Sequence, residues 1–531
     1  MFPSHHPDVE IPNLSIFDYL FGGLRPEELG RVALINPATG AETTYGALRS
    51  QIEALAGELA ARGVGPGDVV GLLSPNIPEF ATVFHGVLRA GATVTTLNAL
   101  YTAAEIEKQL RDAKASWLFT VSPLLTQAVA GAEAAGIPAD RIVVLDGAEG
   151  HASLRDFLTT GAPAPELSFD PAETVAVLPY SSGTTGVPKG VMLTHKNLVA
   201  NVEQSRHMLD LNGDDRVLAV LPFFHIYGMT VLLNIALFVR ASLVTMPKFD
   251  LVQFLENIQQ FSCTYVFVAP PIMVALSKHP IVDQYDISTV RTILSGAAPL
   301  DGATAERAAK RLGTQVLQGF GMSELSPVSH MIPSDRDDIP RSSIGMSLPN
   351  ITCKLVDIET GEEYTEFGED GLTKPGELWV QGPNVMLGYL GRPDATAESI
   401  TADGFLRTGD IAVRSKDGWY AIVDRAKELI KYKGYQVAPA ELEALLLTNP
   451  EIADAAVIGV TVEDGEEVPK AFVVRAEGSA LSESDVMEFV IERAAPYKKV
   501  RQVEFIDVIP KSSSGKILRK DLREREKSLA G

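Results

Sequence analysis

Cysteine, long apolar runs and positive charge are all scarce in this chain, and each shortage excludes a class of protein. The two cysteines, Cys263 and Cys353, cannot build a disulfide framework, which is typical of a protein that folds in a reducing compartment. No run of about 18 apolar residues occurs, so no transmembrane helix is expected. The N-terminus has no basic-then-apolar signal pattern and residues 529–531 form no peroxisomal signal, so we expect a cytoplasmic protein.

The shortage of positive charge limits the partners of the chain. Its formal net charge is −22, and the field of such a protein repels nucleic acids and anionic membrane surfaces. A ligand that carries phosphate would therefore need local basic islands. The candidates for such islands are Lys189, Lys431, Lys433, Lys498, Lys499, Arg501 and Lys516. We expect small-molecule partners and no nucleic acid.

Strand-like and helix-like segments alternate through the first part of the chain, and 531 residues are too many for one core. Apolar runs predict strands at 69–73, 94–97 and 117–121, with helices at 79–88 and around 106–113. The pattern recurs about 148 residues later, with strands at 217–221, 243–246 and 265–268 and helices at 230–238 and 251–258. This duplication predicts two βαβ-type sheets, with a ligand cleft beyond the carboxyl ends of their strands.

The pattern changes after about residue 350. Short strands punctuated by glycine, at 376–382, 386–390 and 419–423, predict a third, β-rich subdomain. The segments 441–447, 455–460, 471–474, 485–493 and 503–508 then alternate between helix and strand and predict a small α+β domain. The expected fold class is α/β, with a large N-terminal domain at 1–424, a short hinge at 425–427 and a small C-terminal domain at 428–531.

Residues 180–190, which read YSSGTTGVPKG, are the most informative segment. Glycines allow close approach of the backbone, free N–H groups and hydroxyls can surround an anion, and Lys189 adds a positive charge. The segment is therefore typical of a polyphosphate-binding loop. It is not a Walker A motif, because Gly190 rather than Ser or Thr follows Lys189. A flexible Ser/Gly hairpin is the alternative interpretation.

Six further motifs follow in order: GAAP at 296–299, GFGMSE at 319–324, GELWVQG at 376–382, TGD at 408–410, DRAK at 424–427 and SGK at 514–516. With the loop, they resemble the adenylate-forming enzymes: acyl-CoA synthetases, nonribosomal peptide adenylation domains and beetle luciferases. Much of the chain is similar to the 4-coumarate–CoA ligase subgroup. The resemblance implies an acid–CoA ligase that uses ATP, Mg²⁺ and CoA. It would form an acyl adenylate with release of pyrophosphate, and then the thioester with release of AMP.

Three residues are implied by this resemblance to take part in catalysis. Lys516 would supply the cation for adenylation, although a lysine is ordinarily a solvated surface residue. Lys431 would reach the adenylate, but Lys427 and Lys431 also have the spacing of a solvated helix face. His225 would lie where carboxylate and thiol meet, whereas a histidine in an apolar run is otherwise a core residue. The small domain is expected to rotate at Lys427 between the two half-reactions and to exchange Lys516 for its hinge-side face.

The resemblance also implies binding residues. Glu324 would hold Mg²⁺, and Asp410 would accept the ribose hydroxyls near Arg425. Ser323 and Phe320 stand where the family commonly has threonine and tyrosine, and they keep the hydroxyl and the aromatic face. The full nucleotide set is Ser181, Ser182, Gly183, Thr184, Thr185, Lys189, Ala297, Ala298, Gln318, Gly319, Phe320, Ser323, Asp410, Arg425, Lys427 and Gln436. The implied CoA contacts are Lys248, Lys433 and Gly434.

The acyl group is expected to contact Tyr227, Val231, Gly319, Pro327 and Val328. Val231 stands where plant coumarate ligases often have a serine that faces the 4-hydroxyl. The expected substrate is an aromatic acid of the cinnamate or 4-coumarate type, and the expected state is a monomer or weak homodimer. The alternatives are a medium-chain or branched fatty acyl-CoA synthetase, a luciferase-like oxygenase, a carrier-loading adenylating enzyme and an inactive adenylate-binding regulator.

Overall fold

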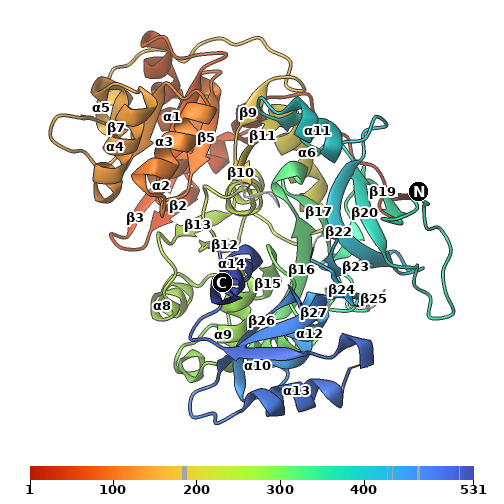
Figure 1. Ribbon diagram of the computed structural model, residues 1–531. Coiled ribbons are helices and arrows are strands. Elements are labelled where there is room, and N and C mark those ends of the chain that lie inside the picture. The colour runs from red at the N-terminus through yellow and green to blue at the C-terminus, as the bar shows by residue number, and fades with distance from the viewer. Residues whose placement is uncertain are drawn as a thin grey trace.

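Two of the sheets in this α/β structure repeat one topology, as the sequence predicts (Figure 1). The computed structural model describes residues 1–181, 188–426, 428–432, 435–462, 467–494, 496–512 and 515–530. In the first repeat, β4 (Val69–Leu73) pairs in parallel with β5 (Thr93–Leu97) and β6 (Trp117–Thr120). In the second, β12 (Arg216–Ala219) pairs in parallel with β13 (Ser242–Thr245) and β14 (Tyr265–Val268). The predicted duplication is confirmed.

The first sheet occupies the red-to-yellow part of Figure 1, with helices gathered around its strands. Its order is β10-β11-β9-β5-β4-β6-β7-β8, and β21 pairs with β11. The further strands are β7 (Ile142–Val144), β8 (Ala152–Ser153), β9 (Val175–Val177), β10 (Tyr180–Ser181), β11 (Lys189–Thr194) and β21 (Gly388–Tyr389). The helices are α1 (Tyr45–Ala61), α2 (Pro78–Arg89), α3 (Ala103–Asp112), α4 (Leu125–Ala135), α5 (Leu154–Leu158) and α6 (His195–Arg206).

The second sheet continues far beyond its βαβ repeat. Its order is β1-β19-β20-β22-β23-β18-β17-β16-β15-β14-β12-β13-β2-β3. The added strands are β1 (Phe2–Pro3), β2 (Val32–Asn36), β3 (Ala41–Thr44), β15 (Thr292–Ser295), β16 (Gln315–Gly321), β17 (Val328–Met331), β18 (Gly345–Ser347), β19 (Thr352–Val356), β20 (Gly376–Gln381), β22 (Leu406–Arg414) and β23 (Trp419–Arg425). Its helical segments are a π-helix (Tyr227–Asn234), α7 (Ile235–Val239), α8 (Leu251–Phe261), α9 (Pro270–Lys278), α10 (Gly302–Leu312) and α11 (Pro393–Ser399).

Three details of the sequence prediction are corrected by the structure. The β-rich segment after residue 350 is hydrogen-bonded into the second sheet, because β16 pairs in parallel with β15 and antiparallel with β17. The strand expected at 386–390 has only two residues, Gly388–Tyr389, and it pairs with β11 of the first sheet. The helix expected at 230–238 is also divided into a π-helix and α7.

The C-terminal segment has its own apolar core, which includes Val457, Val473 and Val486, and it lies at the bottom of Figure 1. It contains β24 (Ile430–Tyr432), β25 (Tyr435–Val437), α12 (Pro439–Leu447), β26 (Ile452–Thr461), β27 (Glu467–Arg475), α13 (Glu483–Ile491), β28 (Gln502–Phe505) and α14 (Arg519–Ala530). The strand expected at 503–508 ends at Phe505. Within the described ranges, no helix is both long and apolar enough to cross a membrane.

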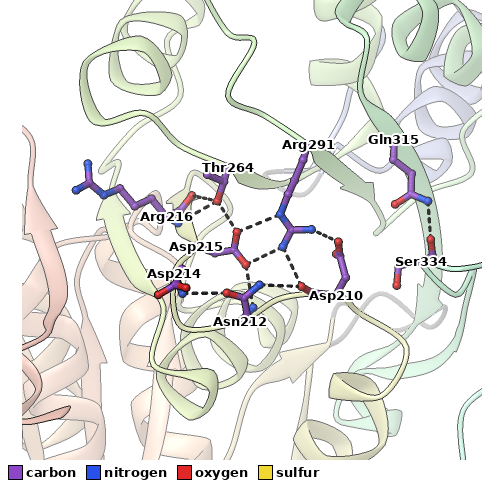
Figure 2. A network of polar contacts seen from close by, with 9 residues as sticks. All are labelled: Asp210, Asn212, Asp214, Asp215, Arg216, Thr264, Arg291, Gln315 and Ser334. Atoms are coloured by element: carbon purple, nitrogen blue, oxygen red, sulfur yellow. Dashed lines mark hydrogen bonds and ion pairs between the residues drawn. The ribbon is translucent and has the colours of Figure 1, made fainter. Parts of the chain in front are cut away.

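A buried polar network ties the amino ends of the second sheet together (Figure 2). Asp215 precedes β12, is 4% exposed, and accepts hydrogen bonds from Thr264 Oγ1 at 2.7 Å and from Arg291 Nη2 at 2.7 Å. Arg291 precedes β15 and also forms an ion pair with Asp210, whose side chain is 45% exposed. Because parallel strands share one direction, this network lies at the edge opposite the carboxyl ends.

Asp215→Ala is expected to lower stability much more than Asp210→Ala. The first change leaves Arg291 and Thr264 without their buried acceptor, a loss of about 1–3 kcal/mol, whereas an exposed ion pair is worth less than about 1 kcal/mol. Thermal unfolding followed by circular dichroism measures both effects. The specific activity of folded protein should be unchanged in both variants. Equal midpoints for the two variants would contradict the role of the network.

Candidate active site

The carboxyl ends of three parallel strands meet at the predicted site. Val268 of β14 lies opposite Ser295 of β15, and Ser295 lies opposite Gln318 of β16. Gln318 is buried and donates from Nε2 to the carbonyl of Leu300 at 2.9 Å. It therefore holds the end of β16 against the loop that follows β15. The sheet register brings together the two predicted motifs that start at these strand ends.

Tyr227 packs against the carboxyl end of β15. It belongs to the π-helix, it is buried, and its hydroxyl donates to the carbonyl of Leu294 at 3.3 Å. A Cβ atom at Gly296 would lie 2.9 Å from the Tyr227 ring, so a larger residue would displace the ring. Ala297 follows with a φ of 72°, which turns the chain sharply, and Ala298 is partly exposed beside it. The backbone at Gly296 therefore passes close to the phenol ring of Tyr227.

The other residues expected near the acyl group are apolar and enclosed. Val231 of the π-helix is 0% exposed and Val328 is 6% exposed. Pro327 is buried, and Gly319 is partly buried. Asn201 of α6 holds Val328 through both backbone groups, with bonds of 3.0 Å to N and 2.7 Å to O. Sequence reasoning missed Asn201, because its partner lies 127 residues away and no local pattern marks it.

Lys516 reaches the edge of the large sheet from the C-terminal domain. It follows Gly515, whose φ is +81° and whose missing side chain lets the loop pack against Pro271, with 3.0 Å between a Cβ built there and the proline ring. The Lys516 residue is exposed to solvent, but neighbouring protein atoms partly desolvate its ammonium group. This desolvation and the charge of Arg425 lower the pKa of Lys516 to about 8, against the attraction of Asp410 and Glu324.

Asp410 and Arg425 form an ion pair beside Lys516. They lie opposite each other on β22 and β23, and Arg425 Nε donates to Asp410 Oδ1 at 3.0 Å. Asp410 is only 7% exposed, and burial raises its pKa although Arg425 and Lys516 act in the opposite direction. Gly409, with a φ of 73°, turns the chain just before this carboxylate. The pair can offer a carboxylate acceptor and a cation to a sugar hydroxyl or a phosphate.

His225 lies at the start of the segment that leads into the π-helix. Its Nδ1 accepts a hydrogen bond from the backbone N–H of Tyr227 at 3.3 Å. Burial, and to a smaller extent the charge of Lys516, lower the pKa of His225 to about 4. The imidazole is therefore neutral near pH 7, and Lys516 is close enough to affect it. The structure therefore places His225 and Lys516 near each other.

Glu324 connects the base of the phosphate loop with a residue that sequence reasoning missed. It is 5% exposed, and its Oε1 accepts hydrogen bonds from Ser181 Oγ at 3.2 Å and from Tyr389 OH at 2.7 Å. Lys189 lies over the Tyr389 ring, with Nζ 4.9 Å from the centroid. Tyr389 is in none of the motifs, so its only signal was the predicted strand at 386–390.

The residues present fit a magnesium ion that is shared with a phosphate ligand. Among the described residues, no cluster of three or more acidic, histidine or cysteine side chains could hold a metal by itself. Magnesium keeps several waters and binds through one or two carboxylates plus substrate phosphates. Glu324 supplies one such carboxylate beside Ser181 and Lys189 at the base of the loop.

The remaining predicted residues divide into three groups. Phe320 lies within β16 and Ser323 just after it; both are partly buried, and the Phe320 ring stands edge-on to His330 at 6.1 Å. Lys248 is exposed in the turn between β13 and α8. Outside the described residues or side chains lie Ser182, Gly183, Thr184, Thr185, Lys427, Lys431, Lys433, Gly434 and Gln436. The surface cavity of about 600 Å³ lined by Tyr19, Glu203 and Phe238 contains none of the predicted site residues.

Comparisons with known proteins identify the family of the chain. The family model described as AMP-binding enzyme matches residues 26–390, and that described as AMP-binding enzyme C-terminal domain matches residues 441–516. The 4-coumarate–CoA ligase 2 of Nicotiana tabacum is 41% identical over 536 residues, which cover 99% of this chain and 97% of that protein.

Solved structures with a similar fold include other ligases of small acids. ATP-bound MatB from Rhodopseudomonas palustris has a TM-score of 0.88 at 30% identity, covering 98% of this chain and all of that one, whereas its apo form has a TM-score of 0.77. The anthranilate CoA ligase AuaEII in complex with anthranoyl-AMP has a TM-score of 0.88 at 27% identity, covering 97% and 98% of the chains. The chain therefore belongs to the AMP-binding enzyme family, and it is an AMP-forming acid–CoA ligase similar to the 4-coumarate–CoA ligases.

Proposed function

We propose that this ligase activates an aromatic acid of the cinnamate or 4-coumarate type. The observation that carries the proposal is that Tyr227, Val231 and Val328, which are expected around the acyl group, are all buried and uncharged and so would form an apolar surface. A flat ring suits such a surface, since aromatic rings stack and pack edge-to-face on one another. Support also comes from the names of relatives that act on 4-coumarate and anthranilate.

In the first half-reaction, the acid carboxylate attacks the α-phosphate of ATP and pyrophosphate leaves. We propose that Lys516 stabilises the negative charge that develops on the transferring phosphate, because a positioned cation is worth most in a partly desolvated site. Asp410 would accept the ribose hydroxyls while Arg425 fixes its carboxylate. His225, being neutral, would orient the substrate carboxylate through a hydrogen bond. Glu324 would hold Mg²⁺, which supplies charge neutralisation for the phosphates when bound.

In the second half-reaction, we propose that the small domain at 428–531 turns about residues 425–427 and carries Lys516 away. The separate apolar cores on either side of this segment support such a motion, because each body can move without exposing its interior. The face with Lys431, Lys433, Gly434 and Gln436 would then line the thiol entrance. Lys248 and Lys433 would contact CoA, and the nucleotide set named above would retain the adenylate.

A fatty acyl-CoA synthetase is the second candidate, because an enclosed apolar surface also accepts an alkyl chain. Formation of AMP that depends on CoA, measured with cinnamate, 4-coumarate, benzoate, hexanoate and a branched short-chain acid, separates the two. The proposal requires the highest kcat/KM with a ring-bearing acid. A preference for hexanoate would contradict the aromatic assignment and leave the ligase activity intact.

Lys516→Ala is expected to lower adenylation by about 10²–10³-fold, since removal of one preorganised donor has this cost. The thioester-forming step from a supplied acyl adenylate should be nearly unchanged, because Lys516 is expected to be outside the site in that step. Pyrophosphate exchange and thioester formation measure the two steps separately. Equal losses in both steps would contradict the proposed rotation.

The adenylation rate should fall on the alkaline side. Since the pKa of Lys516 is lowered to about 8, its ammonium is charged below this pH and loses its proton as the pH rises through it. The kcat/KM for ATP reports the free enzyme and should decline above about pH 8. In Lys516→Arg the guanidinium stays charged, so the alkaline limb should move upward even if the rate is lower. Identical profiles for the two proteins would show that another group titrates.

Val231→Ser tests the pocket itself. Valine offers no partner to a buried phenol, whose unpaired hydroxyl is disfavoured by roughly 1–3 kcal/mol. We expect wild-type enzyme to activate cinnamate at least as well as 4-coumarate, and the serine variant to shift the ratio of kcat/KM towards 4-coumarate. The shift should be modest, because apolar pockets reject an added hydroxyl weakly. A wild-type preference for 4-coumarate above about tenfold would contradict the role of Val231.

A further inference from the structure

Residues 386–390 form a short segment that connects Glu324 with the phosphate loop. Met386 N donates to the Glu324 carbonyl at 2.9 Å. Leu387 N donates to Met192 O at 3.0 Å, and Leu390 N donates to Gly190 O at 2.9 Å. This segment therefore fixes β11, the strand that follows the proposed phosphate loop, and Glu324 relative to each other.

Tyr389, at the centre of this segment, contacts both charged groups with one side chain. Its hydroxyl donates to Glu324 Oε1 at 2.7 Å, and its ring lies under Lys189 Nζ at 4.9 Å. Tyr389 is 8% exposed, and its backbone N–H donates to Thr396 Oγ1 at 2.9 Å. The phenol therefore stands at a defined position between a carboxylate and an ammonium group.

Gly388 and Thr396 fix the position of Tyr389. Gly388 has a φ of +149°, and a Cβ atom at this position would lie 2.8 Å from Thr396 Cγ2. The glycine allows α11 to approach the segment closely, so that Thr396 can fix the backbone of Tyr389. Because the Tyr389 backbone is fixed by Thr396, its side chain can hold other groups in defined positions.

The two groups that contact this phenol carry opposite charges and attract each other. The Tyr389 hydroxyl donates to Glu324, while the ring face attracts Lys189 through its quadrupole. Among the described residues, both side-chain hydrogen bonds to Glu324 reach Oε1. A carboxylate that accepts a hydrogen bond on one oxygen keeps acceptor capacity for a metal ion.

We propose that Tyr389 is a positioning residue for adenylation, which holds Glu324 and Lys189 apart so that both face the magnesium–triphosphate group of ATP. The inference rests on the ATP-dependent ligase activity and is independent of which acid is used. Without the hydroxyl, Glu324 would turn towards the nearby lysines and bind the metal-loaded nucleotide less well.

Calorimetric titration of ATP without any acid tests the proposal, once with Mg²⁺ and once with EDTA. For Tyr389→Phe we expect about tenfold weaker binding of ATP in Mg²⁺, in line with a lost hydrogen bond to a charged group, and unchanged binding in EDTA. Tyr389→Leu also removes the ring under Lys189, so binding should weaken under both conditions. Unchanged affinity of Tyr389→Phe in Mg²⁺ would overturn the proposal.

Tyr364→Phe is the matched control. Tyr364 also donates its hydroxyl to a carboxylate, that of Asp357, in a surface segment between β19 and β20. Both affinities should remain at the wild-type value in this variant, and the unfolding midpoints of all variants exclude a general loss of folding.

Pyrophosphate exchange gives a second measurement, with the acid that wild-type enzyme activates fastest. Tyr389→Phe should need several times more Mg²⁺ for half of its maximal rate and should recover most of kcat at high Mg²⁺. A lower kcat with an unchanged Mg²⁺ requirement would instead indicate a packing role and overturn the proposal. Absence of exchange with every acid in wild-type enzyme would contradict the proposed substrate class without affecting the ATP titration.

Discussion

The packing of Gly515 against Pro271 is the contact on which the site depends. It brings Lys516, from a domain with a separate apolar core, next to Asp410 and Glu324 on the large domain. A side chain at Gly515 would collide with the proline ring, and the φ of +81° disfavours other residues. The proposed catalytic cation would therefore be supplied by a small interdomain contact, so the same domain could also withdraw it.

The electrostatics of the site follow from the acidity of the whole chain. With a net charge of −22, the protein must concentrate its cations where a triphosphate is to bind. Lys516 and Arg425 are close enough to lower the pKa of the lysine, so they would repel each other in the absence of the two carboxylates. Asp410 and Glu324 compensate this repulsion at short range. A ligand with several negative charges would stabilise this arrangement further, because Lys516 and Arg425 would each gain an anionic partner.

The pattern of apolar residues predicted the parts of the fold that repeat along the chain. The βαβ duplication could be read from the period of apolar residues. The fusion of the β-rich segment with the second sheet was missed, because β16 changes from parallel to antiparallel pairing without any change in composition. Tyr389 was missed for a similar reason. Its role arises from pairing between β21 and β11, which lie about 200 residues apart in the chain.

The end of the large sheet shows how a domain that is proposed to rotate can remain attached without a long linker. Arg425 is fixed by Asp410, and Ala426 N donates to Gly409 O at 2.9 Å, so the chain is held up to that residue. Asp424, which is 3% exposed, accepts a hydrogen bond from Ala440 N at 3.1 Å, at the first turn of α12. A carboxylate at a helix N-terminus stabilises the helix by about 0.3–1 kcal/mol. Burial raises the pKa of Asp424 to about 6, because desolvation disfavours its ionised form. A contact of this size orients α12 and would still be weak enough to break in the proposed rotation.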